Sequence, residues 1–116
     1  MKYILTIYLL FIFNQANAAF YNGNDLLEIC KSETEINDKE ISKEDKCASY
    51  IAGIYDAYFT FNKWGLIADT LCFEDTMKIE DLVNVSIKHI KAKPDELNMQ
   101  AGSLVLNALV ESFPCN

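Results

Sequence analysis

The chain has 116 residues, of which 17 are acidic and 10 are basic, so its formal net charge at pH 7 is −7. All the basic residues are lysines, and the sequence contains no arginine. An acidic surface of this kind repels nucleic acids and anionic lipid heads, and it favours a basic protein as a partner. The composition therefore excludes nucleic-acid binding, and the length fits a single domain.

The first residues have the pattern of a secretory signal peptide. Lys2 provides a positive charge, an almost continuous apolar run covers residues 3–13, and Ala16-Asn17-Ala18 offers small residues to a signal peptidase. The apolar run has about 11 residues, whereas a membrane-spanning helix needs roughly 20. We therefore expect residues 1–18 to be removed during export, leaving no membrane anchor. The remaining domain, residues 19–116, has a net charge of −8 because the removed segment contains one lysine and no acid.

Four cysteines remain in this domain, and export makes disulfides their expected state. They are Cys30, Cys47, Cys72 and Cys115. Zinc sites usually bring cysteines in close pairs such as C-x-x-C, but these four are far apart and His89 is the only histidine. We expect two disulfides, no metal and no free thiol. Three pairings are open on these grounds alone.

Apolar spacing predicts four helices and no strand of useful length, which defines an all-α fold. The first helix is short, opens within residues 22–25 with Asn24 or Asp25 as its cap, and ends at Cys30. A charged segment at residues 31–46 is expected to be a connector. The second helix is predicted to start at Ser42, with Asp45 as its capping-box partner.

The second helix combines an apolar face with a glycine. Its apolar positions recur every three or four residues: Cys47, Tyr50, Ile51, Ile54, Tyr58 and Phe61. Gly53 lies within the same helix, where glycine costs about 1 kcal/mol relative to alanine. We therefore expect another helix to approach Gly53 closely.

The third and fourth helices follow a loop at residues 62–77. The third has Glu80 and Asp81 in its first turn and Lys88 and Lys91 near its end, an order that complements the helix dipole. Its apolar face consists of Ile79, Leu82, Val83, Ile87 and Ile90. Pro94 is predicted to end it and to be the first residue of the fourth helix. The buried stripe of the fourth helix consists of Leu97, Ala101, Leu104, Val105, Ala108 and Phe113.

The order of the helices favours one pairing of the cysteines, since short connections make consecutive helices antiparallel neighbours. Cys30 ends the first helix and Cys47 begins the second, so both lie at one end of the bundle. Cys72 precedes the third helix and Cys115 follows the fourth, so both lie at the other end. We therefore predict Cys30–Cys47 and Cys72–Cys115, stabilising by about 3 and about 4 kcal/mol in the chain-entropy account.

No set of residues in the sequence is typical of a catalytic site. His89 lies among lysines late in the third helix and is expected to be a surface residue. None of the serines is flanked by the glycines of a nucleophile elbow. Acidic pairs such as Glu74/Asp75 and Glu80/Asp81 are usually solvated at loops and helix starts. We expect a protein that is not an enzyme and has no cofactor.

Aromatic side chains gather at the end of the second helix and in the loop after it. They are Tyr55, Tyr58, Phe59, Phe61 and Trp64. Tyr50 and Tyr58 are expected to serve the core, but Tyr55, Phe59 and Trp64 cannot all share that face. These three either close the core beneath the loop or form a protein interface, where exposed tyrosine and tryptophan are favoured. The acidic loop beside them is the best partner-binding candidate in the sequence.

Four segments form a recognisable set when they are taken in order. They are Phe20 to Cys30; Cys47 with Tyr50-Ile51-x-Gly53-Ile54-x-Asp56-Ala57; Cys72 with Leu82-Val83, Ile87-Lys88-His89-Ile90 and Pro94-x-Glu96-Leu97; and Ser103-Leu104-Val105-x-x-Ala108-Leu109 with Phe113-Pro114-Cys115. Together they resemble the Tai-type (Rap/Tai) family of type VI secretion amidase immunity proteins over essentially the whole of residues 19–116. Two positions depart from that family: Glu74 stands where proline is frequent, and Lys78 where a threonine cap is frequent.

The resemblance implies a helical periplasmic immunity protein that binds and blocks a secreted peptidoglycan amidase. Several members of that family are homodimers that insert a loop into the Cys/His cleft of the effector. From loop position and charge, we place the contact at Trp64, Asp69, Glu74 and Asp75. The alternative is a small periplasmic helical binding protein, similar to an acid-stress chaperone, without a dedicated effector.

Overall fold

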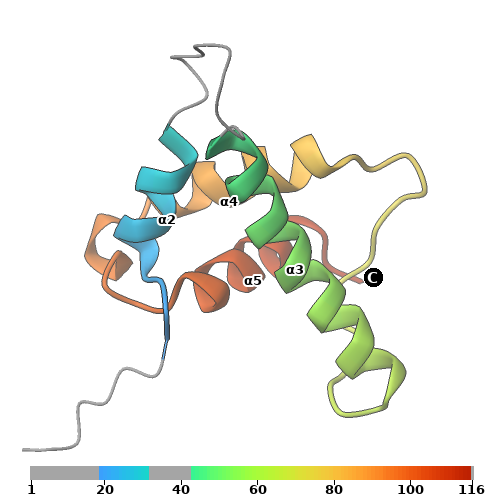
Figure 1. Cartoon of the computed structure of the whole chain (residues 1–116). Coiled ribbons are helices and arrows are strands. Elements are labelled where there is room, and N and C mark those ends of the chain that lie inside the picture. Colours follow the sequence, from blue (N-terminus) through green and yellow to red (C-terminus); the bar gives the residue numbers. More distant parts are fainter. Residues whose placement is uncertain (1–18, 32–42, 116) are drawn as a thin grey trace, which may run out of the picture.

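A computed structural model describes residues 19–31 and 43–115 of the chain. Within these ranges the protein consists of four α-helices and no strand, as predicted (Figure 1). The helices are α2 (Gly23–Cys30), α3 (Lys43–Lys63), α4 (Ile79–Lys91) and α5 (Ala101–Ser112), with a 3-10 helix, η2 (Pro94–Glu96), before α5. The predicted start of the second helix at Ser42 lies outside the described residues.

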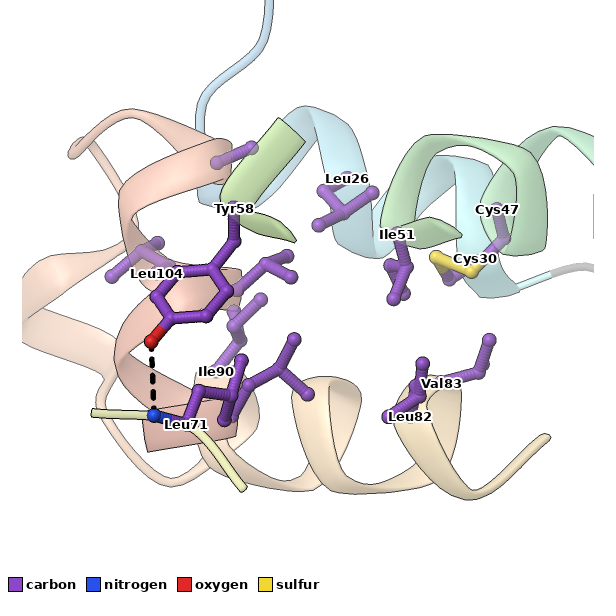
Figure 2. Packing of buried hydrophobic residues seen from close by; sticks show 13 residues of the cluster. Leu26, Cys30, Cys47, Ile51, Tyr58, Leu71, Leu82, Val83, Ile90 and Leu104 are labelled. Carbon is purple, nitrogen blue, oxygen red and sulfur yellow. Dashed lines mark hydrogen bonds between the residues drawn. A yellow bond between two sulfur atoms is a disulfide. The ribbon is translucent and has the colours of Figure 1, made fainter. Parts of the chain in front are cut away.

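The core lies between the four helices, and each contributes apolar side chains to it (Figure 2). Its largest fully buried apolar side chains are Leu26, Ile51, Leu71, Ile90, Leu104, Leu109, Val105 and Cys47. One assignment is wrong, since Phe61 is 44% exposed although it continues the apolar face of α3. The C-terminal turns of α3 extend past the other helices, so no neighbouring helix covers them (Figure 1).

Helix α2 begins with a reciprocal cap at Asn22, and not at Asn24 or Asp25 as expected. The Asn22 side chain accepts a hydrogen bond from the Asp25 amide at 3.1 Å, and Asp25 Oδ2 accepts one from the Asn22 amide at 2.9 Å. Asn24 instead donates its side-chain amide to the carbonyl of Leu97 at 3.3 Å. Pairing of Asn22 with Gln100 in an isolated β-bridge holds the chain extended just before the helix.

The fourth helix does not begin at Pro94, so that prediction is wrong. Pro94 starts the short 3-10 helix, and α5 begins only at Ala101. The first two amides of α2 explain the interruption, because they donate to the carbonyls of Met99 and Leu97, both at 3.1 Å. These carbonyls therefore serve the start of α2, and Leu97 packs on the core from outside α5.

The close helix contacts occur at two other glycines and not at Gly53. A Cβ atom at Gly53 would meet nothing within 4 Å, and the residue is exposed. On α5, a Cβ at Gly102 would lie 3.1 Å from Cδ1 of Ile54 in α3. At the start of α2, a Cβ at Gly23 would lie 2.7 Å from Cδ1 of Leu104. The expected approach of another helix to Gly53 is therefore wrong.

Both disulfides have the predicted pairing. Cys30–Cys47 joins the end of α2 to the start of α3, with the two Cα atoms 5.1 Å apart. Cys72–Cys115 joins the loop before α4 to the segment after α5, with the two Cα atoms 4.9 Å apart. No helix in the described part of the chain is long and apolar enough to cross a membrane.

Candidate partner-binding site

The loop between α3 and α4 is anchored to the core by the hydroxyl of Tyr58, whose residue is 4% exposed. This oxygen accepts hydrogen bonds from the amides of Thr70 at 2.8 Å and Leu71 at 3.0 Å. It also donates to the carbonyl of Ala68 at 3.2 Å. Figure 2 shows the bond to Leu71, whose side chain points into the core. A buried hydroxyl thus supplies partners to a stretch of backbone that belongs to no helix.

The C-terminal segment holds the same loop from its other side. The Cys72 amide donates to the carbonyl of Phe113 at 2.9 Å, and the Cys115 amide donates to the carbonyl of Thr70 at 3.3 Å. These bonds flank the Cys72–Cys115 disulfide and the β-bridge of Leu71 with Pro114. The stretch 70–72 is therefore fixed both covalently and by hydrogen bonds.

A surface pocket of about 660 Å³ lies between α3 and the segment that leads into α4. We call it the loop pocket. Its lining includes the rings of Tyr55 and Phe59 from α3 and of Phe73 from the loop. The Tyr55 ring centroid lies 4.7 Å from both the Phe59 and the Phe73 centroids, and Phe73 lies 5.1 Å from Phe113. Aromatic pairs at such distances stabilise one another beyond their buried area, so these rings form one wall of connected side chains.

Three carboxylates, those of Asp69, Glu74 and Asp75, line the loop pocket and are exposed. The ion pairs found in the described residues are both made elsewhere, by Glu111 with His89 and with Lys93. Asp69, Glu74 and Asp75 therefore have no cationic partner within the described residues. The Nζ atom of Lys78, which also lines the pocket, lies more than 4.0 Å from the carboxylate oxygens of all three.

Three of the four residues assigned to partner binding from the sequence thus line one pocket, but Trp64 does not. It is 66% exposed in the turn after α3, with its ring centroid 6.1 Å from that of Phe61. Leu66 and Ile67 are also exposed at this turn. Tyr55 therefore packs beneath the loop, as the first alternative for the aromatic residues expects, whereas Trp64 faces solvent.

Two residues that build the site were not predicted to do so: Tyr58, which anchors the loop, and Phe73, whose ring lines the pocket. Phe73 follows Cys72, and Phe113 lies two residues before Cys115, so the predicted disulfide already placed the two rings near each other. The hydrogen bonds of Tyr58 had no such signal, because its partners are main-chain groups of an irregular loop.

Burial raises the pKa of the Tyr55 hydroxyl above its ordinary value, and the neighbouring Asp56 carboxylate raises it further. Desolvation disfavours the phenolate, and a nearby negative charge does the same. Tyr55 is therefore a neutral aromatic surface at neutral pH.

His89 is not the exposed residue that was expected, because its side chain is only 10% exposed. Its Nδ1 lies 3.5 Å from a Glu111 oxygen, and its Nε2 is buried without a hydrogen-bond partner. The reason is that α4 packs against α5 along this face. No serine or thiol is bonded to this imidazole within the described residues, so the arrangement has no nucleophile and base pair.

One group of potential metal ligands occurs in the described residues, and its chemistry does not fit a metal. Asp69, Cys72 and Cys115 bring ligand atoms within 4.8 Å of one another. Both sulfur atoms belong to the Cys72–Cys115 disulfide, so neither is available as a thiolate, the form that binds zinc. The group is a disulfide with an exposed carboxylate beside it.

The fold and the site define a class: a small helical domain closed by two disulfides, with an acidic and aromatic surface pocket beside one of them. A family model described as Rap1a immunity proteins matches residues 22–115. The chain belongs to the Rap1a immunity protein family, which confirms the resemblance. No protein of curated function matches the chain. Family membership implies immunity against a type VI effector and binding to that effector.

Proposed function

We propose that the chain is exported, loses residues 1–18, and acts in the periplasm as domain 19–116. There it binds a peptidoglycan amidase delivered by type VI secretion and occludes the active-site cleft of that enzyme. Trp64, Asp69, Glu74 and Asp75 make the contact in this proposal. The amidase and the cleft come from the family resemblance, whereas the contact residues come from this chain.

The observation that carries the proposal is the loop at residues 66–78, whose carboxylates are exposed and whose stretch 70–72 is fixed to Tyr58 and to the C-terminal segment. A loop that is ordered before binding loses little conformational freedom in the complex, so more of its contact energy appears as affinity. Tyr58 and the Cys72–Cys115 disulfide provide this order. Trp64 adds a large exposed side chain of the type that contributes most at protein interfaces.

An acidic loop suits the cleft of an enzyme that uses cysteine and histidine. A carboxylate placed beside a catalytic histidine favours the imidazolium form, which cannot act as a general base. The same loop excludes the substrate by filling the cleft. Carboxylates without internal ion pairs, such as Glu74 and Asp75, are available for this role.

The first test is a pull-down with the exported, oxidised protein as bait. The prey is the mixture of proteins secreted by the same strain and by closely related strains. The proposal expects one peptidoglycan amidase at a stoichiometric ratio, and an equimolar amount of the bait then stops that enzyme from hydrolysing peptidoglycan. Changing Glu74 and Asp75 to lysine abolishes both results.

A matched control carries two charge reversals away from the loop, at the exposed residues Glu28 in α2 and Asp95 in η2. This variant has the same net charge as the test variant and retains capture and inhibition. Capture of many denatured proteins only in acid contradicts the proposal and favours the chaperone-like alternative. If capture and inhibition are lost equally in both variants, the assignment of Glu74 and Asp75 as contact residues is wrong.

The proposal includes a homodimer, as the resemblance implies. Leu66 and Ile67, in the turn after α3, are exposed apolar side chains that a dimer would bury, which leaves Trp64 to the effector. Light scattering on the purified protein measures the mass directly. The mass of one chain at micromolar concentration contradicts this part and leaves the proposed inhibition untouched.

A further inference from the structure

The loop pocket combines three aromatic rings and three carboxylates in about 660 Å³. Tyr55, Phe59 and Phe73 present ring faces and edges, while Asp69, Glu74 and Asp75 provide negative charge. An apolar ligand would leave the carboxylates unpaired, and an anion would be repelled by them. The chemistry that satisfies both halves is a flat cation.

Arginine is the protein side chain with these properties. Its planar guanidinium stacks on aromatic rings, its fork of N–H donors matches carboxylates, and its stem is apolar. We infer that the loop pocket binds an arginine side chain of the protein partner. The stem lies against Phe59 and Phe73, and the guanidinium meets the carboxylates. This inference rests on the proposed function for the identity of the partner.

The charges around the pocket support this occupant. None of the three carboxylates forms an ion pair or a side-chain hydrogen bond with another described residue. Among the described residues that line the pocket, Lys78 is the one cation. Its side chain is not needed for the cap of α4, where its main-chain amide donates to Asp81 Oδ2 at 3.0 Å. Lys78 therefore repels an incoming arginine without holding the loop.

The test is an NMR titration of the exported, oxidised protein with arginine amide, and with citrulline amide as its neutral counterpart. We expect arginine amide to change the backbone amide chemical shifts of residues 69–79. These changes should saturate with a dissociation constant of about 1–10 mM, which is typical of so small a ligand. Citrulline amide has the same shape without the charge, so its binding is weaker by tenfold or more.

Variants test the two halves of the pocket separately. Asp69→Asn, Glu74→Gln and Asp75→Asn together weaken arginine binding at least tenfold, whereas the same amide replacements at Glu28, Asp95 and Glu96 leave it unchanged. Lys78→Met strengthens binding about two- to threefold, which is the Coulomb effect in water of removing one like charge for an assumed separation of roughly 8 Å. The Lys78 variant keeps the test valid if the neutralised loop unfolds.

Three results overturn the inference: no saturable shift in residues 69–79 up to about 50 mM ligand, equal binding of citrulline amide, or no gain with Lys78→Met. The titration needs no amidase, so it is independent of the pull-down. Capture of an amidase without arginine binding contradicts only the inference about the loop pocket. Arginine binding without capture of any amidase contradicts the proposed function but still supports an arginine site in the loop pocket.

Discussion

Replacing Tyr58 by phenylalanine removes one oxygen atom and keeps the ring in the core. The amides of Thr70 and Leu71 then lose their acceptor. Thr70 is exposed, so water replaces the oxygen there, but Leu71 is 2% exposed and its amide stays without a partner. A buried donor without an acceptor costs about 1–3 kcal/mol, so we expect the free energy of unfolding to fall by about that amount.

Denaturant unfolding of the oxidised protein, followed by circular dichroism, measures this loss. Tyr55→Phe is the matched control, since it also removes a tyrosine hydroxyl from α3. The Tyr55 hydroxyl forms no hydrogen bond with another described residue. A loss below about 0.5 kcal/mol relative to that control, less than an ordinary hydrogen bond contributes, would refute the anchoring role of Tyr58. If the loss of unfolding free energy is larger, changes in the NMR chemical shifts of the backbone amides at residues 68–72 in Tyr58→Phe show that it arises in the loop.

Three other changes have defined outcomes. Replacing Cys72 and Cys115 by alanine, with the other disulfide intact, lowers the free energy of unfolding by about 4 kcal/mol; an unchanged denaturation midpoint contradicts the chain-entropy reasoning. Gly53→Ala raises the free energy of unfolding by about 1 kcal/mol, because alanine favours the helix and its Cβ atom meets no neighbour. A lower free energy of unfolding in the same assay contradicts the absence of a neighbour at Gly53. Burial raises the pKa of Tyr50, aided by Tyr21 and opposed by a hydrogen bond with Gly102, and burial likewise raises that of Tyr55. The unfolded chain therefore releases these protons first, so stability is complete below about pH 10 and falls as pH rises through the folded pKa values. Phenylalanine at both tyrosines makes that alkaline loss shallower in thermal melts, and an unchanged slope rejects the assignment.

The sequence predicted the features that depend on period and order along the chain. Helical faces follow from apolar spacing, and the two disulfides follow from which helix ends lie together. The errors occurred where one helix meets another. Gly53 and Gly102 look alike in the sequence, but only Gly102 faces a neighbouring helix. Pro94 could start a helix on local grounds, yet the first amides of α2 take up the carbonyls of Leu97 and Met99.

The candidate site was predictable to a similar extent. Asp69, Glu74 and Asp75 were assigned to an exposed segment because charge in a loop between helices marks one, and all three are exposed. Their convergence on one pocket was not predictable, because it requires the path of the loop. That path depends on main-chain hydrogen bonds to Tyr58, and a sequence pattern does not encode which backbone atoms a buried hydroxyl will meet.

The position of Leu71 has a consequence for motions of the protein. Its amide is buried, is bonded to the Tyr58 hydroxyl, and lies next to a cysteine bridged to the C-terminal segment. Exchange of this hydrogen with solvent therefore requires opening of the core itself and not fraying of the loop. A residue outside every helix is thus expected to exchange as slowly as the helices do, so the loop opens together with the core as one cooperative unit.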